Sequence, residues 1–165
     1  MSTLIYVETS IPSFYFETRE RTRFQAMREW TREWWEVAKV RDTLVTSEAV
    51  FAELSRAPEP KCAEATALLK PLRMLAGGPD VDTVVDAYLA HKLMPRDALG
   101  DARHLALATF HRCDILATWN CQRPPPLPCG LCFAQAISLR SVAGPASGGS
   151  SGAAACGGCR AHSHF

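Results

Sequence analysis

Three acidic side chains and one amide occupy positions in the sequence that are typical of a divalent-metal site in a parallel α/β protein. Glu8 and Asn120 each follow an apolar run, Glu53 comes shortly after another, and Asp101 opens a run with helical apolar periodicity. In open parallel sheets, ligands bind at the carboxyl ends of the strands, where these side chains are expected to meet. Carboxylate and amide oxygens suit Mg²⁺ or Mn²⁺, and a cation held there can bind a phosphate oxygen and lower the pKa of a bound water. The pattern predicts a metal-dependent hydrolytic site with Glu8, Asp101 and Glu53 as the metal ligands.

Each of these four residues also has a structural interpretation. Asp101 is compatible with a carboxylate that favours a helix N-terminus, Glu53 with a solvated acid beside an apolar stripe, and Asn120 with a turn cap. Glu8 is harder to explain structurally, because an acid at the end of a buried strand needs a partner. If the three acids surround one void, their mutual repulsion raises the pKa of at least one of them in the metal-free protein.

Five neighbouring residues could support a metal site or serve the fold alone. Thr9 and Ser10 could hydrogen-bond the first acid or a metal-bound water, and Ser10 is also a candidate helix N-cap. Asp97 is either a helix cap or a further acid that orders metal-bound water. Glu48 is expected to complement a helix N-terminus, and His104 to be a core histidine rather than a base.

The elements that would position these residues alternate between strand and helix. Strands are predicted at residues 3–7, 43–46, 72–75 and 114–118. Helices are predicted from residue 10, over 21–40, from the second strand to about 56, and over 61–70, 81–93 and 99–110. Strands that alternate with helices imply a parallel sheet with right-handed crossovers.

The helix over 21–40 is predicted to bury one apolar stripe. The stripe residues recur at steps of three and four: Phe24, Met27, Trp30, Trp34 and Ala38. The tryptophans Trp30, Trp34 and Trp35 could alternatively form a surface for a partner protein or a second copy of the chain. Packing is the expected role, because two of the three fit the stripe.

Bulk properties place the chain among ordinary globular domains. Its 165 residues are enough for one domain with a real core, and its net charge of +1 gives no global basic field that would announce a nucleic-acid partner. No secretory signal and no apolar run of transmembrane length is visible. Seven cysteines without an export signal are expected to be reduced thiols, which predicts a cytoplasmic location.

The composition changes after Cys121. All 17 acids lie at or before Asp114, alongside 15 of the 18 Lys and Arg residues, so residues 1–121 carry a net charge of −2 and residues 122–165 carry +3. The latter segment holds seven of the ten glycines and five of the eleven prolines. Such a segment cannot bury enough apolar area to offset its ordering entropy. We therefore predict a domain over 1–121 and a disordered or non-native tail over 122–165.

Four segments of the chain resemble the motifs of PIN domains. They read YVETS at 6–10, TSEAVFAEL at 46–54, GDARHLALA at 100–108 and LATWN at 116–120. The group they most resemble is the VapC-like toxins of bacterial type II toxin–antitoxin systems. The similarity covers roughly residues 3–121, with the motifs in the right order and spacing.

The resemblance implies a three-layer α/β/α fold with a parallel sheet of four to five strands. It implies an endoribonuclease that uses Mg²⁺ or Mn²⁺ to hydrolyse RNA, with a small antitoxin as partner, possible homodimerisation and no membrane association. The four family acids fall on Glu8, Glu53, Asp101 and Asn120. Two departures matter, since the first position usually carries Asp and the fourth is usually acidic.

The tail departs further from the family, which normally continues with a helix and a final edge strand. Its Pro, Gly, Ala, Ser, Arg and Cys bias is typical of an off-frame reading of GC-rich DNA, so we hypothesise a frameshift near codon 121. A different interpretation is a zinc module, because the CxxC pairs at 129–132 and 156–159 precede His162 and His164. The long spacer, which lacks strand patterning, disfavours that interpretation.

Two alternatives to an active nuclease follow from these departures. The chain could be a catalytically impaired remnant that only binds an antitoxin through its helices, or less plausibly the zinc-binding module. Basic residues within 19–32, together with Lys92, Arg96 and Arg103, could contact RNA phosphates. The near-neutral charge makes that signal weak.

Overall fold

A computed structural model describes residues 2–91, 99–120 and 137–138 of the chain. The strands are β1 (Leu4–Val7), β2 (Thr43–Ser47), β3 (Arg73–Leu75), β4 (Ile115–Ala117) and β5 (Ile137–Ser138). The helices are α1 (Ser10–Tyr15), α2 (Thr22–Arg41), α3 (Glu48–Leu54), α4 (Lys61–Leu69), α5 (Pro79–Ala90) and α6 (Leu99–Phe110). The predicted strands and helices of residues 3–118 are confirmed, with boundaries shifted by a few residues at most.

The sheet has the order β3-β2-β1-β4-β5, and its first four strands are parallel. β1 is flanked by β2 and β4, with Tyr6 opposite Val45 on one side and Leu116 on the other. β5 pairs with β4 as an antiparallel edge strand, with Ile137 opposite Leu116. The parallel pairing brings the carboxyl ends of β1, β2 and β4 to one edge of the sheet, where the predicted site residues follow.

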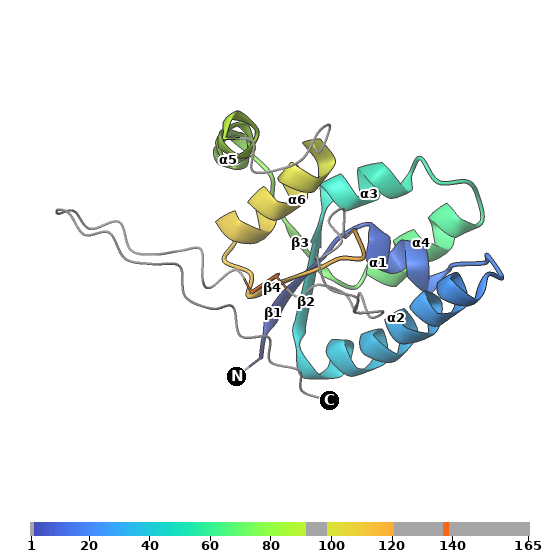
Figure 1. Cartoon of the computed structure of the whole chain (residues 1–165). Helices are drawn as coiled ribbons and strands as arrows, with labels where there is room; N and C mark the ends of the chain where they lie inside the picture. Colours follow the sequence, from blue (N-terminus) through green and yellow to red (C-terminus); the bar gives the residue numbers. More distant parts are fainter. Residues whose placement is uncertain (1, 92–98, 121–136, 139–165) are drawn as a thin grey trace, which may run out of the picture.

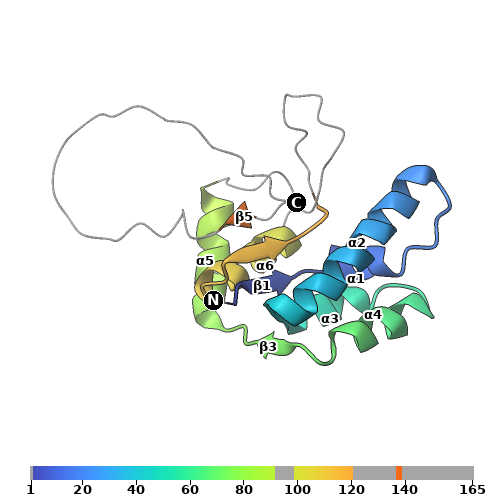
Figure 2. The same ribbon diagram turned by 90° about the horizontal axis from the view of Figure 1, so that it is seen from below.

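Helices cover both faces of the sheet, which makes the three-layer α/β/α architecture that was predicted. Figure 1 shows α5 and α6 on one side of the strands and α1, α2 and α4 on the other, and Figure 2 shows the same separation after a quarter turn. The helices of each layer also pack on one another, α5 on α6 and α1 on both α2 and α4. α3 follows β2 directly and contacts both α4 and α6, so it closes the edge at which β2 ends.

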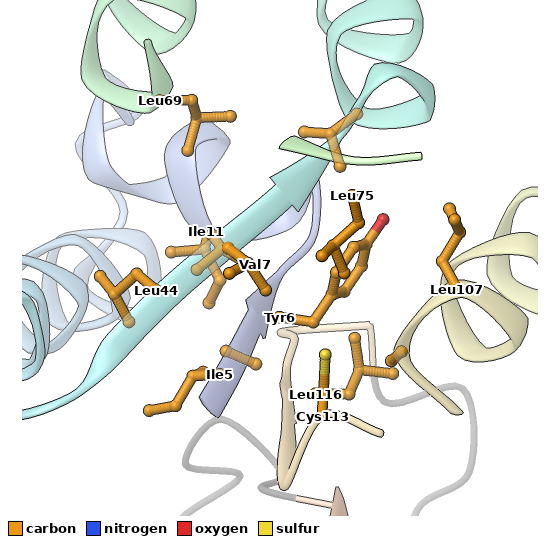
Figure 3. Close-up of a cluster of buried hydrophobic side chains, with 14 of the residues drawn as sticks. Ile5, Tyr6, Val7, Ile11, Leu44, Leu69, Leu75, Leu107, Cys113 and Leu116 are labelled. Carbon is orange, nitrogen blue, oxygen red and sulfur yellow. The ribbon is translucent and has the colours of Figure 1, made fainter. Parts of the chain in front are cut away.

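The core lies on both faces of β1, because successive side chains of a strand point in opposite directions. Figure 3 shows Tyr6 directed toward Leu107 of α6, while Ile5 and Val7 lie on the side of Leu44 and Ile11. All of these side chains are buried. The site residues that follow β1 therefore stand on a rigid, fully packed strand.

The buried stripe of α2 differs from the predicted one. Met27, Thr31, Trp35 and Ala38 are buried, whereas Trp30 and Trp34 are only half-buried. The correction has a physical cause: Thr31 donates to Met27 O at 2.6 Å and accepts from the Trp119 indole at 2.8 Å, so its hydroxyl is satisfied inside the core. Reading only apolar residues skips Thr31 and rotates the stripe by about one position.

The predicted tail lies almost entirely outside the described residues, as do Asp97, Lys92, Arg96 and the paired cysteines and histidines beyond residue 121. The exception is β5, two residues of the tail that pair with β4. Across the described residues, we find no helix with the length and apolar character needed to span a bilayer.

Candidate active site

Three of the four predicted site residues line one cavity at the carboxyl edge of the sheet. Val7 of β1 lies opposite Ala117 of β4, so the residues that follow, Glu8 and Thr118, stand beside each other. The first turns of α6 bring Asp101 and His104 over the same edge. The cavity measures about 110 Å³, and its lining consists of Glu8, Asp101, His104, Leu105, Leu116, Thr118 and Asn120.

Glu8 is a buried acid that accepts hydrogen bonds from Ser10 and Thr118. Its side chain is 6% exposed, and Ser10 donates its hydroxyl to the carboxylate oxygen Oε1. The same hydroxyl accepts a hydrogen bond from the backbone N–H of Trp119 at 2.7 Å, which fixes its orientation. Burial raises the pKa of Glu8, and the hydrogen bond from Ser10 offsets this only in part. The predicted raised pKa is thus present, but its main cause is burial rather than repulsion between acids.

Asp101 and Asn120 form the more open wall of the cavity. Asn120 donates from its amide nitrogen to Asp101 Oδ1 at 2.7 Å, and its own backbone N–H is held by the Thr118 hydroxyl at 2.8 Å. The amide therefore orients the Asp101 carboxylate instead of merely capping a turn. Asp101 also lies in the first turn of α6, so the structural role considered for it is fulfilled as well.

Glu53 is held beside the cavity, not among the residues that line it. Thr9 donates to its Oε2 at 2.5 Å, and His104 Nε2 lies 3.2 Å from its Oε1. The contact with His104 lowers the pKa of Glu53, which keeps this carboxylate ionised. Gly100 permits the arrangement, because a Cβ at that position would stand 2.8 Å from Glu53 Oε1.

His104 connects the site to the core through a buried chain of polar groups. Its Nδ1 lies 2.8 Å from the Tyr6 hydroxyl, which lies 2.7 Å from Ser47 Oγ. All three side chains are buried, and burial raises the pKa of Tyr6, so the phenol stays protonated. Nε2 of His104 is buried and lies 3.2 Å from Glu53 Oε1, but the contact does not have the geometry of a regular hydrogen bond. His104 was expected to be a core histidine, and it is one that also faces the site.

The donor set fits a hydrated divalent cation better than a cage of three acids. Among the residues that the structure describes, no three His, Cys, Asp or Glu side chains are grouped so that they could hold one metal ion. The expected sharing of one ion by Glu8, Asp101 and Glu53 is therefore not reproduced. Glu8 and Asp101 do face one cavity, and the buried, under-compensated charge of Glu8 is of the kind that a cation would neutralise. Mg²⁺ keeps several waters and is commonly bound through one or two carboxylates, so this pair fits it.

The supporting residues behave partly as expected. Ser10 binds the first acid as predicted, but it does not cap α1, whose N-cap position is Thr9. Thr9 binds the second acid instead of the first. Glu48 lies in the first turn of α3, where an acid favours the helix N-terminus.

Sequence reasoning missed the roles of Tyr6, Ser47 and Thr118. Tyr6 was counted only as part of an apolar run, although its hydroxyl needs a partner when buried. The signal that could have revealed the network is the coincidence of Tyr6, Ser47 and His104 at the ends of elements that meet at one sheet edge. Nothing in the spacing alone distinguishes them from ordinary core residues.

Comparisons with known proteins agree with this geometry at the level of the fold. No protein-family model matches the chain, and no curated protein sequence does. Among solved structures, the crystal structure of VapC20 from Mycobacterium tuberculosis, a sarcin-ricin loop cleaving toxin, is similar with a TM-score of 0.53 and 17% identity, over 68% of this chain and 86% of that one. The chain has a PIN-like, VapC-like α/β fold. At this identity the likeness concerns the fold, and the case for function depends on the cavity.

Proposed function

We propose that the chain is a metal-dependent endoribonuclease, the toxin of a toxin–antitoxin pair, which hydrolyses RNA phosphodiester bonds. The observation that carries the proposal is the convergence of Glu8 and Asp101 on one cavity at the carboxyl edge of a VapC-like sheet. When bound, Mg²⁺ or Mn²⁺ supplies positive charge that lowers the pKa of water and offsets the charge developing on the phosphate. Glu8 and Asp101 would hold the ion, and an antitoxin would be the protein partner.

The residues of the chain itself divide the remaining work. Asn120 fixes one oxygen of Asp101, whose side chain lines the cavity. Ser10 orients Glu8 through its hydrogen bond to Oε1. Because burial raises the pKa of Glu8, a bound cation would favour the ionised form of its carboxylate. Glu53, ionised and held by Thr9 and His104, adds negative charge next to the cavity and can orient a water or a ribose hydroxyl.

The test is an RNA-cleavage assay with the full chain, in EDTA and with added Mg²⁺ or Mn²⁺. Wild-type protein is expected to cleave only with a divalent ion, and Asp101→Asn to lose at least about 100-fold of that activity. Asp86→Asn is a matched control, because Asp86 is an exposed acid on α5. Cleavage in EDTA, or equal activity in wild type and Asp101→Asn, would contradict the proposal.

A second candidate is a partner-binding remnant without nuclease activity. It is favoured by the absence of a group of three possible metal ligands among the described residues. Under this alternative, no divalent ion restores cleavage, yet the chain still forms a complex with the small protein encoded by the adjacent reading frame. Growth arrest on expression that depends on Asp101 would exclude it.

A further inference from the structure

A second concavity lies next to the active-site cavity, between α3 and α6. Figure 1 shows these two helices next to each other at the edge where the parallel strands end, and they are in contact. We define the α3–α6 groove by its lining residues, which include the small residues Ala49, Ala52 and Gly100 and the arginines Arg56 and Arg103. Its volume is about 490 Å³, within the range of about 300–1,000 Å³ that ligand sites occupy.

Three of the lining residues of the groove carry little or no side chain. Ala49 and Ala52 contribute one methyl group each, and Gly100 contributes no side chain. A Cβ at position 100 would lie 2.8 Å from Glu53 Oε1, which is too close. Glu53 lines the groove and lies 3.2 Å from His104, which lines the active-site cavity, so the two concavities are adjacent. A chain that crosses that site can therefore continue through the groove.

Arg56 and Arg103 give the groove free or exchangeable positive charge. Arg56 is exposed, and no hydrogen bond or ion pair of its guanidinium occurs within the described part of the chain. Arg103 contacts Asp82 at 3.4 Å, with both side chains about half exposed at 43% and 55%. Such a surface pair is worth little and exchanges readily for a stronger anion.

Two acids also line the groove, and the charge of Arg56 is, after the contact with His104, among the causes that lower the pKa of Glu53, yet the Arg56 guanidinium has no hydrogen bond or ion pair within the described residues. Glu53 is already occupied by Thr9 and His104, and Glu48 is exposed, where solvent screens it. A guanidinium presents a planar fork of donors that matches the oxygens of a phosphate. The anion that fits two such forks beside a hydrolytic site is the backbone of the nucleic-acid substrate.

We propose that the α3–α6 groove binds the phosphate backbone of single-stranded RNA next to the scissile bond, with Arg56 and Arg103 each contacting one phosphate. This inference rests on the proposed ribonuclease function and adds the path of the substrate. It assigns the RNA to the α3–α6 side of the site, away from the basic residues on α2.

The test measures binding separately from cleavage. Affinity of the full chain for a fluorescent single-stranded RNA is determined by anisotropy in EDTA, over about 50 to 200 mM KCl. Arg56→Ala and Arg103→Ala are each expected to weaken binding about tenfold and to reduce the slope of log K against log [salt] by about 0.7, the value for one phosphate contact on a single strand. Arg56→Lys, which keeps the charge, should retain most of the slope.

Arg41→Ala is the matched control, because Arg41 is exposed and precedes β2, at the sheet edge opposite the site. It should bind RNA like wild type. Equal RNA affinities and equal salt dependences for the Arg56, Arg103 and Arg41 variants would overturn the proposed RNA-binding role of the groove. An absence of RNA binding by wild type at low salt would overturn it as well. Loss of an acidic protein partner from the groove variants, with unchanged RNA binding, would reassign the groove to that partner.

Failure of the two proposals is distinguishable. If wild type binds RNA through the arginines but cleaves none with any divalent ion, the proposed nuclease function is wrong and the proposed RNA binding by the groove is supported. If cleavage requires Asp101 but does not change when either arginine is replaced, the proposed RNA binding by the groove is wrong and the nuclease function is supported. Thermal unfolding of each variant excludes misfolding as the cause, and Arg56, which has no ion pair within the described residues, is the cleaner of the two.

Discussion

Glu8 and Glu17 are both carboxylates with almost no exposure, 6% and 5%, yet their pKa values move in opposite directions. Burial raises the pKa of Glu8, whereas the hydrogen bond from Arg19 lowers that of Glu17 to about 2. The largest cause differs: desolvation dominates at Glu8, whereas the hydrogen bond from Arg19 dominates at Glu17. Glu17 accepts from the N–H groups of Thr18 and Arg19 at 3.0 Å each and from the Arg19 guanidinium at 2.5 Å.

This comparison separates an acid that serves the fold from an acid that serves a site. Glu17 is saturated, and its backbone carbonyl also accepts from Arg28, so it ties the end of α1 to α2. Glu8 faces a cavity, and its hydrogen bonds from Ser10 and Thr118 do not offset the rise in its pKa that burial causes. A buried charge left so under-compensated costs stability, and such a cost is typical of functional positions. Four substitutions test this distinction.

The largest effect is expected for Glu8→Gln, which should reduce divalent-ion-dependent cleavage by at least about 100-fold. Its effect on stability should have the opposite sign. Because the folded-state pKa of Glu8 is raised, the ionised acid opposes folding at pH 7, and a neutral amide removes that opposition. Thermal unfolding in EDTA should show Glu8→Gln at least as stable as wild type at pH 7, with the advantage lost as the pH falls below the unfolded pKa of Glu. A clearly destabilised variant would contradict this.

Glu17→Gln should do the reverse, with a loss of about 2 kcal/mol of unfolding free energy at pH 7 and no change in the activity of the folded protein. Because the folded-state pKa of Glu17 is lowered, the stability that its ionised form contributes is fully present above about pH 4.5 and disappears as the pH falls through about 2. Urea unfolding across this range should show the two proteins converging at low pH. Glu20→Gln, an exposed neighbour, is the control.

A smaller effect is expected for Ser10→Ala, which removes both the donor to Glu8 and the acceptor for the Trp119 N–H. We expect about a tenfold loss of cleavage, because Glu8 loses its orientation, and a loss of about 1 kcal/mol in stability. Ser13→Ala on the same helix should change neither. Wild-type cleavage by Ser10→Ala would mean that the cavity orients Glu8 without it.

The smallest effect is expected for Arg19→Ala, because Arg19 is 56% exposed and its ion pair is screened. Stability should fall by less than about 1 kcal/mol. The pKa of Glu17, followed by NMR, should rise from about 2 but stay below the ordinary value, because two backbone donors remain. An unchanged pKa would assign the whole effect to the backbone.

The sequence was sufficient to predict the order of the elements, because apolar periodicity and turn residues are local signals. It also identified Glu8, Asp101 and Asn120 as neighbours, since the ends of parallel strands must share an edge. The sequence did not predict how each element is oriented. Which face of α2 is buried depends on the Thr31 hydroxyl, which donates to Met27 O and accepts from the Trp119 indole inside the core.

Glu53 shows the same limit within the site. Its place in the chain predicted an acid at the correct edge, and it lies there. Its direction is decided by Thr9, His104 and the missing side chain of Gly100, which come from two other elements. Contacts between side chains of distant segments are not encoded in any local period.

β1 lies at the centre of the sheet but is synthesised first, long before its neighbour β4. The hydrogen bond from Leu4 to Asp114 spans 110 residues, and that from Trp119 to Ser10 spans 109. Glu8 leaves the ribosome early, but its neighbours on β4 follow only when most of the domain has been translated. A nascent chain therefore carries no assembled cavity until late in translation.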